Sequence, residues 1–453
     1  MKRKRIFVVI LAAVLMTVCA AEASASGIRE LIRFAGSGEP VGYEFTAAFV
    51  KLPQFDENRT EQLNRLLRHF IFSGILDARE TTLTVSLDGE SMFTVSETEV
   101  GGKTTGMLAW DTENSVIIPQ EEADGDTFIS GEGYRSISEN LYMYAVLEEY
   151  ALFFGKLPDL YPELSGSGKI LEKYKDYGTA VKKTNIRFTE DEWTACIRKY
   201  APEISEGIKI PDLRKMYFEG RQDVELLLTE EGSVLKIRYG GRAGLSEDDM
   251  RTVRLEWKTV RAENVERDEL SLRTPDSNAA RRNNLLLDHT WRKEENGKEA
   301  FSWKAETDTV YDGIRTREIA ECNMEEADGN ISGRWAETIS VKNENTVYEC
   351  VFTASGEPVA GCSGTLEIIS KKDKIETGRM KVDYRLTSMV PAQAGVYLPE
   401  PVHASGEEFA TLRGNLTRRI LVKILSLPKE DLLFLTEGIP DETVKTILPD
   451  HEQ

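Results

Sequence analysis

The chain has few of the side chains that build metal centres and nucleophilic sites, since its 453 residues include only four histidines and five cysteines. No two histidines stand at the spacing with which a helix presents metal ligands, and His-Glu-x-x-His does not occur. The Gly-x-Ser-x-Gly elbow of serine hydrolases is missing too. We therefore expect no catalytic residues, no metal and no cofactor, and hence a non-enzymatic protein.

An excess of basic charge is also lacking. The 77 acidic residues outnumber the 57 basic ones, which gives a formal net charge of -20. A strongly acidic chain is repelled by nucleic-acid phosphates and by anionic lipid surfaces. We therefore exclude nucleic acid as a partner. A hydrophobic content of 40% still allows a packed core.

A long apolar run occurs only at the N-terminus, where four basic residues precede apolar residues 6–18 and the small residues Ala23 and Ala25 follow. This order is typical of a cleaved export signal. The run is short for a membrane-spanning helix, which needs about 20 residues. The sequence predicts a signal peptide over residues 1–25 and an exported, extracellular or cell-envelope-associated protein. No integral membrane span would remain after cleavage; an uncleaved N-terminal anchor is the alternative.

Export leaves four cysteines, Cys196, Cys322, Cys350 and Cys362, in an oxidising compartment where they could pair. A turn centred on Gly356 would place Cys350 opposite Cys362 across a hairpin. Cross-strand neighbours have β-carbons about 4.5–5.5 Å apart, which is slightly wide for an unstrained disulfide. Cys350–Cys362 is the predicted disulfide, and two unbridged thiols are the alternative.

Residues 26–220 mix strand, hairpin and helix patterns. Asp56 can cap a helix, and Ser136-x-x-Glu139 and Thr189-x-x-Glu192 are capping-box patterns that predict two more. Residues 391–453 are predicted to form an amphipathic helical segment. Its apolar stripe consists of Phe409, Leu412, Leu416, Ile420 and Ile424.

Residues 221–390 alternate apolar and charged side chains between turn signals such as Asp328-Gly329. Met380 and Val382, for example, alternate with Lys381 and Asp383. Sequential hairpins with one apolar and one charged face indicate an antiparallel β-meander. The predicted fold class is α+β, mainly β: a long meander that could curl like a half-barrel, with helices packed on its apolar face.

The tryptophans are the candidate ligand-binding residues. If Gly297 is the centre of its hairpin, Trp291 and Trp303 are cross-strand partners, and Trp257 and Trp335 lie on the same kind of apolar face. Indole rings can line an apolar pocket or form a sugar platform. The alternative is that they only fill the core between sheet and helices.

These patterns predict an exported, soluble, non-enzymatic binding protein that holds an apolar or lipid-like ligand between a curved sheet and helices. The alternative is an extracellular or envelope module for protein–protein interaction or structure, with a filled core and no small ligand. The expected partner is accordingly an apolar small molecule or lipid, or an envelope protein. The volume of any cavity tests the hypothesis of a binding protein with an apolar ligand, because ligand pockets usually exceed about 300 Å³.

Overall fold

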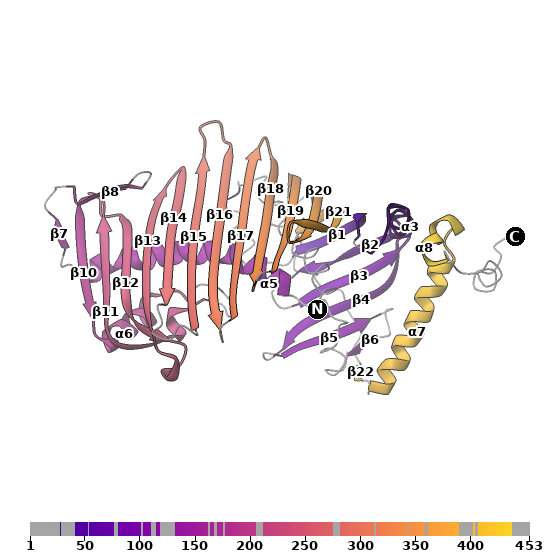
Figure 1. Ribbon diagram of the computed structural model, residues 1–453, viewed down its shortest axis with the longest axis horizontal. Helices are drawn as coiled ribbons and strands as arrows, with labels where there is room; N and C mark the ends of the chain where they lie inside the picture. The colour runs from indigo at the N-terminus through magenta and orange to yellow at the C-terminus, as the bar shows by residue number, and fades with distance from the viewer. Residues whose placement is uncertain are drawn as a thin grey trace.

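A single sheet of 20 strands dominates the computed structural model of this chain (Figure 1). The structure describes residues 28, 41–52, 54–76, 80–100, 103–109, 115–117, 132–161, 164–166, 170–174, 177–204, 212–274, 281–311, 314–342, 344–357, 361–388, 402–403 and 406–436. The predicted signal peptide lies outside these residues.

The predicted antiparallel meander is confirmed from Tyr217 to Ser388, where each strand pairs with the next one along the chain. Its strands are β11 (Tyr217–Leu228), β12 (Val234–Gly244), β13 (Arg251–Ala262), β14 (Val265–Thr274), β15 (Arg281–Lys293), β16 (Glu299–Tyr311), β17 (Ile314–Ala327), β18 (Asn330–Val341), β19 (Glu344–Glu357), β20 (Gly361–Lys372) and β21 (Ile375–Ser388).

Local turn chemistry produces these hairpins. Asp328 and Gly329 join β17 to β18, and both have positive φ angles, of 56° and 73°. Two consecutive positive φ values are what a tight hairpin turn requires, and Asp-Gly is a favoured sequence for it. The turn signal read from the sequence is therefore the one that the backbone uses.

Both ends of the meander continue into other strands of the same sheet. At one end β21 pairs with β1 (Val41–Lys51), and at the other β11 pairs with β10 (Lys182–Phe188). The sheet thus runs without a break past residue 220, where the sequence predicts a boundary; the division into 26–220, 221–390 and 391–453 stays a prediction.

The other strands are β2 (Phe70–Leu76), β3 (Glu80–Leu87), β4 (Glu90–Val100), β5 (Lys103–Ala109), β6 (Ser115–Ile117), β7 (Leu164–Gly166) and β22 (Val402–His403), with β8 (Glu172–Tyr174) and β9 (Gly178–Ala180) in a separate pair.

The helices begin only partly where their capping signals predict. Thr189 caps α6 (Glu190–Tyr200) in a complete capping box with Glu192, as expected. By contrast, α5 begins at Glu132, so Ser136 lies inside a helix rather than at its start. The remaining helices are α3 (Glu57–Leu67), capped by Asp56, α7 (Gly406–Leu425) and α8 (Leu433–Thr436), with short 3₁₀ turns η1 (Leu213–Lys215), η2 (Glu247–Asp249) and η3 (Lys429–Asp431). Within the described residues, no helix combines the length and apolar character needed to cross a bilayer.

Helices α5 and α6 cover the apolar face of the sheet, hereafter the inner face. Figure 1 shows α5 running behind the strands of the meander, across their direction. Met143, Leu147 and Phe153 of α5 belong to the same buried cluster as Trp193 of α6 and the apolar side chains of the strands. C-terminal helix α7 packs elsewhere, with Phe409 and the rest of its predicted stripe near β4 and β5. The predicted arrangement of helices on an apolar sheet face is thus formed mainly by α5 and α6.

Candidate functional site

The four candidate tryptophans all lie on the inner face, on β13, β15, β16 and β18. Trp257, Trp291, Trp303 and Trp335 expose only 1%, 3%, 3% and 2% of their surface. Of these four, Trp257 borders an apolar cavity of about 100 Å³ between the sheet, α5 and η1. That volume is well below the roughly 300 Å³ at which ligand pockets begin. The inner face is therefore closed largely by the chain's own side chains.

Trp291 and Trp303 are not cross-strand partners. Trp291 lies opposite Phe301, and Trp303 lies opposite His289. The prediction placed the hairpin centre at Gly297, but the loop runs from Glu294 to Lys298, which shifts the register by two residues. Gly297 instead takes the positive φ of 87° near the end of the loop. The ligand-binding role of the four tryptophans stays a prediction.

The predicted disulfide is not formed. Cys350 is a free, buried thiol whose cross-strand partner is Ile368, while Cys362 lies opposite Gly356. The β19–β20 hairpin turns three residues later than a centre at Gly356 requires, and this separates the two cysteines by six register positions. Burial raises the pKa of the Cys350 thiol well above its usual value, which makes it unreactive.

A buried carboxylate organises the polar groups of the inner face. Asp268 accepts hydrogen bonds from Trp257 Nε1 (2.9 Å) and from an Arg261 guanidinium nitrogen (2.7 Å), and it contacts His289 Nδ1 (2.9 Å). Burial alone would raise the pKa of Asp268, but His289 and Arg261 outweigh it and lower the pKa to about 2. His289 is thus a buried core residue whose Nδ1 is held by Asp268. This network fixes the position of Trp257.

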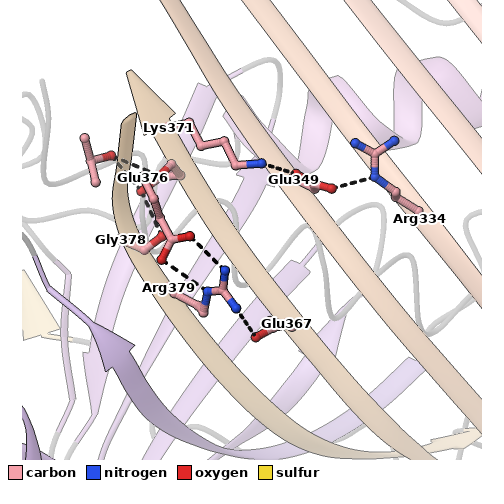
Figure 2. Close-up of polar contacts among 9 residues, drawn as sticks. Arg334, Glu349, Glu367, Lys371, Glu376, Gly378 and Arg379 are labelled. Atoms are coloured by element: carbon pink, nitrogen blue, oxygen red, sulfur yellow. Dashed lines mark hydrogen bonds and ion pairs between the residues drawn. The ribbon is translucent and has the colours of Figure 1, made fainter. Parts of the chain in front are cut away.

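The opposite face, hereafter the outer face, carries cross-strand ion pairs. Figure 2 shows the part on β18–β21, where Glu349 contacts both Arg334 (2.6 Å) and Lys371 (2.7 Å). Beside it, Arg379 contacts Glu376 (2.8 Å) and Glu367 (3.4 Å). Exposed pairs of this kind contribute about 0.2–1 kcal/mol each. Their main effect is on register, because a shift of one residue would turn each charge toward the core.

The outer face is hollowed over β10–β15 into a groove of about 1030 Å³. We call it the ionic groove. Its arginines are Arg187, Arg221, Arg238, Arg254 and Arg273, and its acidic residues are Asp223, Glu225, Glu256, Glu269 and Asp288. In contrast to the tryptophan face, it is open and bordered by charged groups. The ionic groove is therefore larger than the cavity beside Trp257, and it is bordered by more charged side chains.

An irregularity in β11 shapes this groove. Gly220, Arg221 and Gln222 together face the single residue Gly241, so β11 carries a bulge. Gly220 has a φ of +66°, which a side chain would disfavour. Gln222 turns inward and accepts a hydrogen bond from the Tyr239 hydroxyl at 2.6 Å, whereas Arg221 is exposed on the outer face. Bulges of this kind commonly re-aim a side chain next to a functional site.

Two arginines oppose one another in the floor of the groove. Arg254 of β13 and Arg273 of β14 are register partners, and both are exposed on the outer face. Arg273 donates to the Ser271 hydroxyl at 3.1 Å. Within the described residues neither Arg254 nor Arg187 forms an ion pair, in contrast to the arginines of Figure 2. Like charges directly opposite one another destabilise a sheet unless something neutralises them.

Gly240 leaves space beside this pair. It is the register partner of Arg254 on β12, and a β-carbon placed there would meet no atom within 4 Å. Gly240 lies between Arg254 and Asp223 of β11, so a bound group could approach the sheet backbone on the side of Arg254 away from Arg273. The sequence analysis missed these residues because it treated all charges on the polar side of the strands as a solvated face. The signal was present as Gly240-Gly241 within a strand, which often marks a bulge or a close approach.

Comparison with known proteins gives only distant structural matches. No protein-family model and no curated protein matches the chain. A porin covers 78% of this chain and 100% of its own, with 9% identity and a TM-score of 0.29. The outer membrane channel DcaP of Acinetobacter baumannii covers 78% and 96%, with 6% identity and a TM-score of 0.28. Wzi of Escherichia coli, described as a carbohydrate-binding β-barrel of the outer membrane, covers 80% and 87%, with 7% identity and a TM-score of 0.25.

These matches correct two predictions. The sequence predicts a soluble protein without an integral membrane span, whose partner is an apolar molecule, a lipid or an envelope protein, but the matched structures are proteins of the outer membrane. The predicted lipid-like ligand is further opposed by the small cavity behind Trp257. The names printed for the three structures are those of a porin, an outer membrane channel and a carbohydrate-binding β-barrel. TM-scores this low transfer no function to the chain.

Proposed function

We propose that this protein is a non-enzymatic protein of the cell envelope that binds an anionic ligand in the ionic groove. The observation that carries the proposal is the facing pair Arg254 and Arg273, set beside the open position at Gly240. A guanidinium group binds carboxylate or phosphate through two parallel charge-assisted hydrogen bonds. Two facing guanidiniums without carboxylate partners therefore favour a ligand with multiple negative charges. The half-barrel-like curl predicted from the sequence belongs to this proposal as the shape of the sheet that carries the groove.

The net charge of the chain makes this arrangement specific. With a net charge of -20, random placement of charges would surround an arginine with carboxylates. Lys258 and Arg379, for example, each contact at least one glutamate on the same outer face. Arg254 and Arg273 depart from that rule, because neither forms an ion pair within the described residues, although both border a groove that also contains carboxylates.

A calorimetric titration of the protein with inorganic tripolyphosphate at low ionic strength tests the proposal. We expect Arg254→Gln and Arg273→Gln each to weaken binding at least about tenfold, because each removes a charge-assisted contact of roughly 1.5–3 kcal/mol. Arg317→Gln is the matched control: Arg317 is also exposed on the outer face but is paired with Glu306 outside the groove. Equal binding by wild type and by the Arg254→Gln/Arg273→Gln double variant would rule the proposal out.

A further inference from the structure

The ionic groove contains a second like-charge pair, of the opposite sign. Glu269 of β14 and Asp288 of β15 are register partners and both border the groove. Lys258 neutralises Glu269 at 2.8 Å. Asp288 has no ion-pair partner within the described residues, and its neighbour Lys304 is already bound to Glu321 at 2.5 Å. Lys258 thus offsets part of the repulsion in this pair, while Asp288, like Arg254, is left without an ion pair within the described residues.

The two pairs lie at a fixed distance from one another. Arg273 and Glu269 belong to the same strand and the same face, four residues apart. At a rise of about 3.3 Å per residue, their backbone positions are roughly 13 Å apart. Ser271 and Leu286 lie between the two pairs, and both border the groove. The groove thus holds an arginine pair and a carboxylate pair about 13 Å apart along β14, with Glu256 of β13 also bordering it at the level of Ser271.

We infer that the ligand of the ionic groove is an elongated zwitterion, whose anionic group binds at Arg254 and Arg273 and whose ammonium group binds at Glu269 and Asp288. This inference rests on the proposed function, because it assumes that the anionic group occupies the arginine end. A zwitterion would relieve both like-charge pairs at once. A continuous polyanion would relieve one pair and be repelled by the other.

The surroundings of Asp288 support an ammonium partner. Burial and the neighbouring Glu269 raise the pKa of Asp288 above its ordinary value, so the unliganded pair resists carrying two negative charges. A cation placed between the two carboxylates would reverse this effect, because an opposite charge within about 4–6 Å favours the ionised form. Leu286, which is exposed between the two ends, offers an apolar contact for the spacer of such a ligand.

Two capped peptides test the inference. One is phosphoserine-Gly-Gly-Gly-Lys, which in extended form separates its charged side chains by about 13 Å along the backbone. The other carries acetyl-lysine in place of lysine and so lacks only the ammonium charge. We expect the lysine peptide to bind wild type at least fivefold more tightly than the acetylated one. The Glu269→Gln/Asp288→Asn double variant should abolish that preference.

Tripolyphosphate serves as the anion-only probe in the same titrations. We expect the Glu269→Gln/Asp288→Asn variant to bind tripolyphosphate as well as wild type or up to threefold better, because only repulsive carboxylates are removed. If tripolyphosphate binds and depends on Arg254 and Arg273, but acetylation of the lysine changes nothing, the zwitterion inference is wrong while the proposed function stands. If tripolyphosphate does not bind to the arginines at all, the proposed function fails and the inference with it.

Discussion

On the inner face, aromatic rings lie directly over glycines of neighbouring strands. The ring of Phe352 on β19 covers Gly333 on β18 so closely that a β-carbon at Gly333 would lie 2.2 Å from Cζ. Tyr384 covers Gly364 in the same way and donates a hydrogen bond to the Thr353 carbonyl at 2.6 Å. Such pairs let an aromatic side chain fill the volume that glycine leaves open, and they fix the register of neighbouring strands.

Gly333→Ala should therefore destabilise the fold. The new methyl group must displace the Phe352 ring within a closed core, and overpacking of this kind costs about 1–3 kcal/mol. Chemical denaturation would measure the loss. Gly240→Ala is the matched control, since its β-carbon meets nothing within 4 Å, and we expect it to leave the free energy of unfolding unchanged or slightly raised. Equal effects of the two variants would contradict the packing argument.

Asp268 provides a second prediction at this scale. Asp268→Asn keeps the shape but removes the buried negative charge that contacts Arg261 and His289, so we expect a loss of about 3–5 kcal/mol at neutral pH. Because the folded pKa, about 2, is below the unfolded value, the wild-type stabilisation is complete above about pH 4 and is lost as the pH falls toward 2. Denaturation curves between pH 2 and 7 should converge for the two proteins in acid. The same change at exposed Asp383 should have little effect at any pH.

Among the elements, the C-terminal segment is held to the sheet by a charged contact as well as by apolar packing. His69, just before β2, contacts Asp88 at 2.8 Å through Nδ1 and Asp431 of η3 at 2.9 Å through Nε2. Arg68 also pairs with Asp431. Partial burial opposes a charged ring, but the two carboxylates outweigh it and raise the pKa of His69 above its ordinary value.

The docking of η3 and α8 should consequently weaken in alkaline solution. A raised folded pKa means that the stabilisation is complete below about pH 6.5 and is lost as the pH rises through the folded value. Hydrogen exchange of residues 429–436 should accelerate over that range more than the intrinsic rate does. His69→Gln should remove the excess, whereas Arg65→Gln, which disrupts the ion pair with Glu61 and leaves both contacts of His69 in place, should preserve it. Identical pH profiles for wild type and His69→Gln would show that the contact does not hold the segment.

Pattern alone predicts which elements form, but not their register. Alternation along β21 or the capping box of Thr189 and Glu192 depends on neighbours in sequence, and both are confirmed. The position of a strand against its partner depends on loop length, which composition does not reveal. The β15–β16 hairpin has a five-residue loop rather than a turn centred on Gly297, so Trp291 lies two positions away from its predicted partner. The β19–β20 hairpin turns later than predicted, which displaces Cys350 by six positions. Register adds to the reason that the ionic groove was missed, because Arg254 and Arg273 become neighbours only in the observed pairing of β13 with β14.

At the scale of the whole molecule, the sheet depends on one long-range pairing that no local signal indicates. β1 lies beside β21, more than 300 residues later, and this pairing joins the hairpins of β1–β6 to the meander. Ala47 and Val382 are register partners at the junction, and both contribute to the same apolar cluster as α5 and α6. Because that cluster extends from β1 to the far end of the meander, we expect the two parts to unfold together.

Val382→Asn at the junction should therefore destabilise both parts at once. Val382 is fully buried, and an amide without hydrogen-bond partners there costs about 1–3 kcal/mol beyond the lost apolar packing. Hydrogen exchange near mid-denaturation should show strands 41–51 and 217–228 losing protection at the same denaturant concentration, lower than in wild type. Lys381→Asn places the same side chain one residue away on the exposed face and should shift neither. If β1 lost protection while β11 kept its wild-type stability, the junction would separate two independently folding parts, and the continuous sheet would not behave as one cooperative unit.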